Sequence, residues 1–352
     1  MKKAEMPRFP IGDSPIQEKS HDSLRIKVTD KCQWQCAFCH NEGDISTADL
    51  HWGPDTEEVF KSLKEVMPGL KKIHFTGGEP TRDPGLEAVT AGLSALGLEV
   101  KTTTNGQFSP ERLRSLIDAG LKSFNFSMHS LDPERFLRFQ LGRGVWWREK
   151  AKKSGKALPA SELKRTKMTK LKWAQNQIEN QKAMIREARE SGVEVKMNTV
   201  ISNADDIENA AEIFEWAKKE GIPLRLLNDL GNGLESINAI RVFLDTIDAQ
   251  EVLRKVSIGL SACSTVYRTP DGYEFAFKQI RDMKLESMCR SCPRGEDGTC
   301  EEQFYGVRLQ KGKNGKYYVV LCIQESQEET QMPLEDFLES PQFREIQSYM
   351  QA

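Results

Sequence analysis

Three cysteines, Cys32, Cys36 and Cys39, follow the apolar run 24–28 with the spacing C-x3-C-x2-C. Soft thiolate ligands suit iron–sulfur clusters and zinc. A structural zinc site is closed by four ligands, which usually come from paired CxxC motifs. Three cysteines in one short loop therefore predict a [4Fe–4S] cluster that has one iron left open for a small molecule.

A second motif, Thr76-Gly77-Gly78-Glu79-Pro80, ends the next apolar run along the chain. Two successive glycines let the backbone approach a ligand closely, and Glu79 supplies a carboxylate for a cation. Together the two motifs resemble those of the radical S-adenosylmethionine (radical SAM) superfamily. The resemblance implies that the open iron chelates the methionine amino and carboxylate groups of SAM, and that residues 77–80 help to hold the amino group.

Four more cysteines lie near the C-terminus: Cys289 and Cys292 form a CxxC pair, Cys300 follows, and Cys322 comes after a predicted hairpin. Taken alone, the four would also suit a closed zinc site. Beside the first motif, we predict a second, auxiliary [4Fe–4S] cluster. The eighth cysteine, Cys263, is interpreted as a buried or spare thiol, with a ligand role as the alternative.

Composition and charge exclude several classes of protein. The chain has 352 residues, a formal net charge of −2, and no run approaching the roughly 18 apolar residues of a membrane span. The N-terminus has no apolar core typical of a secretion signal. Eight cysteines in such a chain indicate metal or redox chemistry, not a disulfide framework. We therefore expect a cytoplasmic protein.

A basic segment interrupts this even charge distribution. Between Arg143 and Lys172 there are eleven Lys or Arg residues and two Glu residues. One interpretation is a solvated insertion, and the other is an electrostatic lid that attracts an anionic substrate. The segment is too short and irregular to predict a nucleic-acid-binding module, so we do not expect nucleic acid as a partner.

The elements that must position these motifs alternate between strands and helices. Predicted strands are 24–29, 72–76, 98–104, 123–128, 193–201 and 223–227, and predicted helices are 56–67, 85–96, 110–119, 174–191 and 207–219. Such repeats with short connections imply parallel strands, so the fold class is α/β, a partial (βα)6 TIM-like barrel. Function is then expected at the carboxyl ends of the strands, where both motifs lie.

After about Asn228 the alternation stops. Pro270-Asp271-Gly272 and Lys313-Asn314-Gly315 each separate two apolar runs and predict hairpins. We therefore divide the chain into an N-terminal extension (1–21), a radical SAM core (22–228, with a basic insertion at 143–172), a hairpin-rich auxiliary-cluster region (229–325) and a C-terminal helix (326–352).

The barrel and hairpins together resemble the GTP 3′,8-cyclase family of molybdenum-cofactor biosynthesis, with a C-terminal region like the twitch and SPASM auxiliary-cluster domains. The resemblance runs from about Asp22 to Ile323 and rests on segments such as 24–32, 76–80, 103–106, 125–132 and 195–200. It implies that a second cluster is held by Cys289, Cys292 and Cys322. The SAM-binding positions that it implies are Phe38, Gly78 and Ser127. The substrate-binding positions that it implies are Arg25, Thr104, Lys196 and Arg308.

The chain also departs from the cyclase pattern. The basic residue expected before Thr76 is His74, paired arginines reduce to Arg308, and an expected methionine is Asn228. The Gly-Gly tail of the cyclases is not found at the C-terminus, and Cys300 is an extra cysteine. If Cys300 is a fourth ligand, the auxiliary cluster has no open iron for a purine and would act as an electron relay.

We therefore predict a radical SAM enzyme that acts on a small anionic metabolite, a nucleotide or sugar phosphate, and draws electrons from a reductant such as flavodoxin or ferredoxin. One alternative is a peptide-modifying maturase with an auxiliary cluster. The other is a non-catalytic metal-binding module that uses its basic segment to bind nucleic acid. The sequence does not indicate an oligomeric state.

Overall fold

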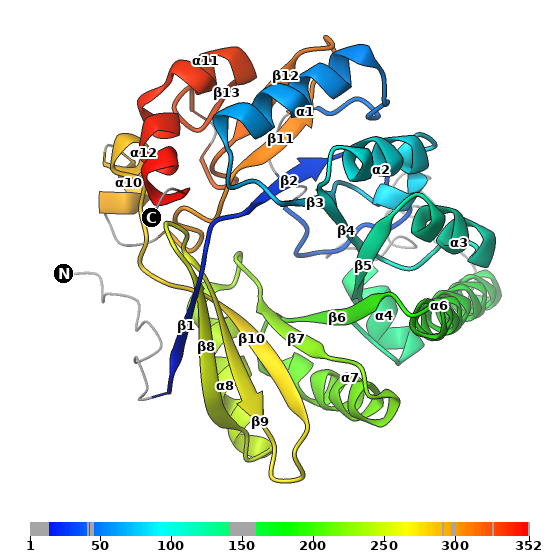
Figure 1. The fold of residues 1–352 in the computed structure, drawn as a ribbon. Coiled ribbons are helices and arrows are strands. Elements are labelled where there is room, and N and C mark those ends of the chain that lie inside the picture. Colours follow the sequence, from blue (N-terminus) through cyan, green and yellow to red (C-terminus); the bar gives the residue numbers. More distant parts are fainter. Residues whose placement is uncertain are drawn as a thin grey trace.

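The computed structural model describes residues 14–40, 42, 46–140, 160–290, 292–296, 300–325 and 327–350, with only the backbone described for 160–167 and 296. Within these ranges thirteen strands form one sheet, in the order β1-β8-β9-β10-β7-β6-β5-β4-β3-β2-β11-β12-β13. The sheet curls, and helices lie along its outer side (Figure 1). Most of the predicted basic insertion, residues 143–159, lies outside the described ranges.

Six parallel strands form the centre of the sheet, which confirms the predicted partial barrel. They are β2 (Ser23–Lys27), β3 (Lys72–Thr76), β4 (Glu99–Thr104), β5 (Leu121–Ser127), β6 (Glu194–Ile201) and β7 (Leu224–Asn228). The connecting helices are α1 (Pro54–Val66), α2 (Leu86–Ala95), α3 (Pro110–Asp118), α4 (Pro133–Gln140), α6 (Ala160–Glu190) and α7 (Ile207–Glu220). Helix α4 and the first half of α6 were not predicted.

Further strands extend the sheet on both sides. Beyond β7 lie β10 (Glu274–Ile280), β9 (Ala262–Arg268), β8 (Gln250–Ser257) and β1 (Ile16–Lys19). Beyond β2 lie β11 (Arg308–Lys311), β12 (Tyr317–Val320) and β13 (Gln331–Pro333). Strands β9 and β10, and strands β11 and β12, are antiparallel neighbours, which confirms both predicted hairpins.

The remaining elements surround these strands. They are η1 (Pro80–Arg82), η2 (Ala204–Asp206), α8 (Gly233–Thr246), α9 (Glu286–Cys289), α10 (Pro293–Glu296), α11 (Leu334–Glu339) and α12 (Pro341–Met350). The C-terminal segment, expected to be one helix, contains β13 and two helices, because Ser340 has extended backbone and its hydroxyl accepts from the N–H of Phe343 at 3.1 Å. The division into core and auxiliary region stays a prediction, since both contribute strands to one sheet.

Along the central strands, apolar side chains that pack in the core alternate with polar side chains that face the inside of the barrel. Leu24 and Ile26 of β2 are buried in the main hydrophobic core, as are Ile73 and Phe75 of β3. Because successive side chains point to opposite faces of a strand, the intervening Arg25 and His74 face the inside of the barrel. Among the described helices, none is both long and apolar enough to cross a membrane.

Candidate active site

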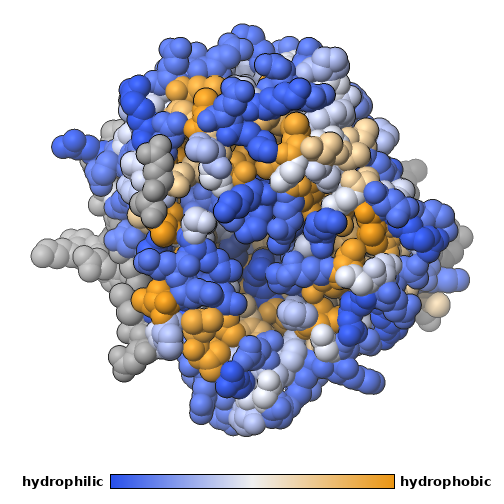
Figure 2. Space-filling view, in the orientation of Figure 1, coloured by the Kyte–Doolittle hydropathy of each residue, from blue (hydrophilic) through white to orange (hydrophobic). Residues whose placement is uncertain are grey.

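The first cysteine motif lies in the loop after β2. Cys32, Cys36 and Cys39 all line one cavity of about 640 Å³. Figure 2 shows a recess near the middle of one face of the molecule, surrounded largely by hydrophilic residues. Two sulfurs receive hydrogen bonds: the N–H of Trp34 donates to Cys32 Sγ at 3.3 Å, and Gln140 Nε2 donates to Cys36 Sγ at 3.5 Å. Such donors stabilise thiolates and tune a metal bound to them.

The two glycines of the second motif pack the loop after β3 against the cysteine loop. A Cβ at Gly77, where φ is +152°, would lie 2.5 Å from the carbonyl oxygen of Thr29, and one at Gly78 would lie 2.4 Å from that of Lys31. The N–H groups of Gly78 and Glu79 donate to these two carbonyls at 2.8 Å each. The glycines are therefore needed for contact between the two motifs, and the contact of this loop with a ligand stays a prediction.

Glu79 is buried and held in one orientation. Its Oε1 accepts from the N–H and hydroxyl of Thr81 and from the hydroxyl of Thr104, at 3.1, 2.6 and 2.6 Å. Among the described residues, its Oε2 accepts a single hydrogen bond, from the N–H of Asn105 at 2.6 Å. Burial raises the pKa of this carboxyl, and the hydrogen bonds oppose the shift. Oε2 therefore keeps capacity to accept a hydrogen bond from a cation in the cavity.

Other predicted SAM-binding residues lie around the same space. Phe38 and Ser127 line the cavity, whereas Pro80 is buried and begins η1. The ring of Phe38 packs edge-on against His129, with centroids 4.7 Å apart. Gln181 Nε2 donates to the carbonyl of Ser127 at 2.8 Å, which fixes the end of β5. The cavity thus offers an aromatic surface beside the cysteines.

The three thiols fit the role of cluster ligands. Burial raises the pKa of Cys32 to about 11 and that of Cys36 to about 12, so both remain protonated at neutral pH without a metal. A bound metal displaces these protons, and three soft donors around one cavity suit iron–sulfur chemistry. Within the described parts of the chain, no three His, Cys, Asp or Glu side chains are already gathered as they would be around a metal ion.

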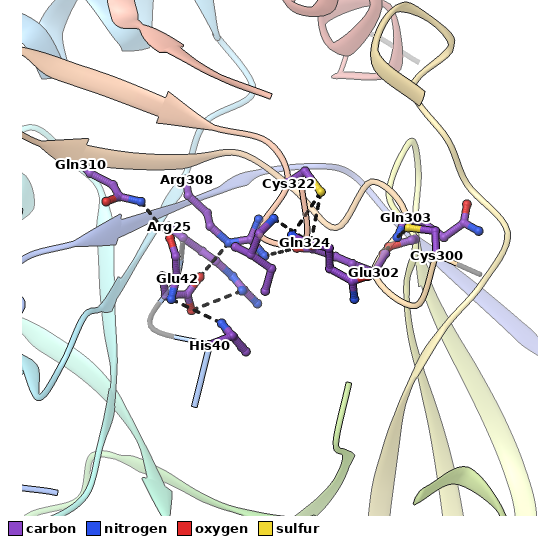
Figure 3. Close-up of polar contacts among 12 residues, drawn as sticks. Arg25, His40, Glu42, Cys300, Glu302, Gln303, Arg308, Gln310, Cys322 and Gln324 are labelled. Atoms are coloured by element: carbon purple, nitrogen blue, oxygen red, sulfur yellow. Dashed lines mark hydrogen bonds and ion pairs between the residues drawn. The ribbon is translucent and has the colours of Figure 1, made fainter. Parts of the chain in front are cut away.

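Two predicted substrate residues, Arg25 and Arg308, join a buried network (Figure 3). Arg308 Nε donates to Glu42 Oε2 at 2.7 Å, and its Nη2 donates to Glu302 Oε1 at 2.5 Å. Arg25 Nη1 lies 3.7 Å from Glu42 Oε1. Although burial opposes the shift, Arg25 and Arg308 hold the pKa of Glu42 well below its usual range. Two carboxylates therefore compensate Arg308 inside the protein.

The other two predicted substrate residues, Thr104 and Lys196, have other partners than this network. Thr104 lines the cavity, but its hydroxyl donates to Glu79. Lys196 is not among the residues that line the cavity, and its ammonium pairs with Glu194 at 2.6 Å. Their contact with substrate stays a prediction.

His74, at the position where the resemblance predicts a basic residue, faces the cavity as a neutral group. Burial, followed by the nearby Arg25, Lys278 and Arg225, lowers the pKa of His74 to about 3. Its Nε2 lies 2.8 Å from the hydroxyl of Thr103. This position therefore adds a hydrogen-bonding group to the cavity but no positive charge at neutral pH.

The C-terminal cysteines gather around a second, smaller space. Cys289, Cys292, Cys300 and Cys322 line a pocket of about 20 Å³, and Cys263 is not among its lining residues. Burial raises the pKa of Cys289 to about 11 and that of Cys322 to about 12. All four predicted auxiliary ligands therefore line one pocket, although their sulfurs are not arranged as they would be around a bound metal ion. Their role as ligands stays a prediction.

Sequence reasoning missed five residues that shape the main cavity. They are Glu42, Arg225, Lys278, Glu302 and Tyr305. One signal was present: Arg225 is the one basic residue of β7, and Lys278 is the one basic residue of β10. A charge in such a strand has to face a polar interior or a ligand. The two glutamates lie in loops and left no such signal.

Comparisons with known proteins identify a family model and several relatives with similar sequences. The family model described as "Radical SAM superfamily" matches residues 26–217. The GTP 3′,8-cyclase of Nautilia profundicola is 27% identical over 291 residues, which cover 79% of this chain and 78% of that protein. The GTP 3′,8-cyclase of Campylobacter fetus subsp. fetus is 27% identical over 281 residues, covering 78% and 76%.

A solved structure shares the fold at lower identity. Streptococcus suis SuiB bound to the precursor peptide SuiA has a TM-score of 0.51 and 16% sequence identity. The match covers 93% of this chain and 66% of that one, so this chain spans about two thirds of the length of SuiB. This likeness concerns the arrangement of helices and strands alone.

Proposed function

The chain belongs to the radical SAM superfamily, and we propose that this enzyme cleaves SAM reductively and uses the resulting 5′-deoxyadenosyl radical to take a hydrogen atom from a small anionic metabolite. The proposed substrate is a nucleotide or sugar phosphate, which undergoes cyclisation, rearrangement or dehydrogenation in cofactor or natural-product biosynthesis. The observation that carries the proposal is the shared cavity, lined by the three cysteines, by Glu79 and by basic side chains. A cytoplasmic location, where thiols stay reduced, belongs to the same proposal.

The roles of the residues follow from their positions. A [4Fe–4S] cluster on Cys32, Cys36 and Cys39 would supply the electron that cleaves SAM, taken from flavodoxin or ferredoxin. Glu79 would accept a hydrogen bond from the SAM ammonium through Oε2, and Phe38 would pack beside the adenine. Gly78 and Ser127 would contact SAM through the loop and strand ends. The contribution of the protein is then position and exclusion of water.

The pocket lined by Cys289, Cys292, Cys300 and Cys322 is proposed to hold a second [4Fe–4S] cluster, which would accept or donate the electron that quenches the product radical. Its volume of about 20 Å³ is close to that of one water molecule, so a single zinc ion is the competing occupant. Iron and acid-labile sulfide analysis separates the two. A second cluster predicts roughly eight iron atoms per chain in the wild type and roughly four in Cys322→Ala.

GTP itself is a second candidate substrate, favoured by the relatives named GTP 3′,8-cyclase. Against it, His74 is neutral and Arg308 is already paired with two carboxylates. The deciding experiment is anaerobic SAM cleavage by the reconstituted, reduced enzyme with and without GTP, followed by 5′-deoxyadenosine. Strong stimulation by GTP would support cyclase-like chemistry, and slow cleavage that ignores GTP would direct the search to smaller phosphates.

Cysteine variants test the assignment of the two clusters. Cys36→Ala should abolish SAM cleavage, because it removes one of three ligands. Cys322→Ala should leave the first cluster and some uncoupled cleavage. Cys263→Ala is the matched control and should behave as the wild type, since Cys263 lines neither cavity. Undiminished 5′-deoxyadenosine formation by Cys36→Ala would overturn the proposed function.

A further inference from the structure

Three basic side chains meet at the ring of Tyr305 in the wall of the main cavity. The guanidinium carbon of Arg25 lies 4.3 Å from the ring centroid, Lys278 Nζ lies 4.4 Å away, and the guanidinium carbon of Arg308 lies 5.8 Å away. Arg25 and Arg308 come from β2 and β11, whereas Lys278 comes from β10, on the other side of the parallel strands. Tyr305 therefore links the strands at the two sides of the parallel part of the sheet by cation–π contacts.

Arg225 adds a fourth charge from β7. Its strand neighbour across the β7–β10 ladder is Ala276, so Arg225 and Lys278 are offset by two residues on adjacent strands and share the face that lines the cavity. Both side chains are half-buried. Within the described ranges, neither has a carboxylate within ion-pair distance. Burial, followed by the nearby Arg25 and Arg225, lowers the pKa of Lys278 well below its usual range.

These cations outnumber their carboxylate partners. Arg308 pairs with Glu42 and Glu302, and Arg25 lies near Glu42. No such ion pair of described residues involves Arg225 or Lys278, although Glu194 partly opposes the lowering of the pKa of Arg225. Three further carboxylates, those of Asp30, Glu79 and Asp229, line the same cavity. In the part of the chain that the structure describes, Arg225 and Lys278 therefore lie side by side in a partly buried space without a carboxylate in ion-pair contact. Like charges held together with little water are unfavourable unless an anion joins them. A phosphate monoester, with a charge of about −2, would balance both cations, and a carboxylate would balance one of them. A triphosphate carries more negative charge than the two cations balance.

We propose that Arg225 and Lys278, assisted by Arg25, form a subsite that binds a single anionic group of the substrate, a phosphate monoester or a carboxylate. The proposal rests on the function proposed above and narrows its substrate class. The planar guanidinium of Arg225 can bind two oxygens of such a group, and the ammonium of Lys278 supplies a compact charge to a third. Tyr305 keeps Lys278 and Arg25 in position.

Binding of simple anions tests the subsite without turnover. The probes are inorganic phosphate, acetate, GMP and GTP, titrated anaerobically into reconstituted enzyme with SAM and followed by calorimetry. Inorganic phosphate or acetate should bind the wild type, and whichever binds identifies the anion class. Lys278→Met should weaken binding of that anion and of GMP at least tenfold, and Lys278→Arg should restore most of it.

The matched control is Lys255→Met, a half-buried strand lysine outside the cavity, which should bind the anions as the wild type does. Thermal unfolding of each variant shows whether it is folded. Equal affinities in Lys278→Met and the wild type, or GTP binding more than tenfold tighter than GMP, would overturn the proposal. Formation of 5′-deoxyadenosine without any anion tests the proposed function separately, because it does not depend on Lys278.

Discussion

At the scale of single residues, charge compensation distinguishes arginines that the sequence could not tell apart. Arg25, Arg225 and Arg308 each lie in a strand beside apolar residues. In the folded protein Arg308 is 2% exposed and bound to Glu42 and Glu302, whereas Arg225 has no such partner among the described residues. A resemblance assigns roles by position. The loops that supply carboxylates decide whether a cation is free for substrate.

Arg308 is therefore expected to stabilise the fold. Arg308→Met would leave Glu42 and Glu302 buried without compensation, and removing one partner from a buried ion pair costs about 3–5 kcal/mol. We expect a loss of this size in the free energy of unfolding, measured by urea denaturation at pH 7.5. The control is Arg268→Met, which breaks an exposed pair with Glu274 and should cost at most about 1 kcal/mol. Equal stability of Arg308→Met and the wild type would instead leave Arg308 available to substrate.

At the scale of elements, the predicted strands follow the sequence because alternation and turn chemistry are local. Strands β2 to β7 carry apolar runs, and the two hairpins are marked by Asp-Gly and Asn-Gly turns. Strands β1 and β8 were missed since they are short of apolar residues: β1 is Ile16–Lys19 and β8 is Gln250–Ser257, each with charged residues. Their pairing with each other is a tertiary contact.

In the candidate site, too, local sequence patterns predict some features and not others. The cysteine and glycine motifs could be predicted because each is continuous in sequence. The approach of Lys278 to Arg25 depends on the pairing of β10 with β7 and of β11 with β2, and on Tyr305 between them. Such contacts between distant segments are set by sheet order, which local patterns do not encode.

A single substitution, Gly78→Ala, tests the contact between the cysteine loop and the loop after β3. Gly78→Ala would place a Cβ 2.4 Å from the carbonyl of Lys31, so the loop after β3 must move away from the cysteine loop. We expect a loss of about 1–3 kcal/mol in the free energy of unfolding, as for other overpacked sites. Iron retained after gel filtration should fall as well.

Gly69→Ala is the control for this substitution, because the nearest atom to its Cβ lies 3.6 Å away, an ordinary contact. It should retain iron as the wild type does and change stability by less than about 0.5 kcal/mol. If Gly78→Ala also keeps full iron and SAM affinity, close packing of the two loops is not required for the site.

At the scale of the whole molecule, the segment 304–307 closes the open side of the curled sheet. The N–H of Ser261, just before β9, donates to the carbonyl of Phe304 at 2.7 Å, and the N–H of Arg25 in β2 donates to that of Val307 at 3.1 Å. This segment follows Cys300 and precedes β11. The region that carries the auxiliary cysteines thus completes the wall of the main cavity, and folding of the two is coupled.

His21 lies at this closure and should make stability depend on pH. It is 2% exposed, its ring contacts Phe304 at a centroid distance of 6.4 Å, and burial lowers its pKa from 6.5 to about 4. In the unfolded chain His21 binds a proton below about pH 6.5, whereas in the folded protein it binds one only below about pH 4. The contribution of His21 to the free energy of unfolding is therefore full above this window and falls by about 2 kcal/mol at pH 5.

The substitution His21→Phe removes this proton and keeps an aromatic ring against Phe304. The difference in free energy of unfolding between His21→Phe and the wild type, measured with urea from pH 8 to pH 5, should shift in favour of the variant by about 2 kcal/mol. His74 and His129, whose pKa values are lowered to about 3 by burial, titrate alike in both proteins and cancel in the difference. Loss of metal at low pH cancels in the same way. Parallel curves over the whole range would mean that His21 can accept a proton in the folded state, so the closure would have to be open to water.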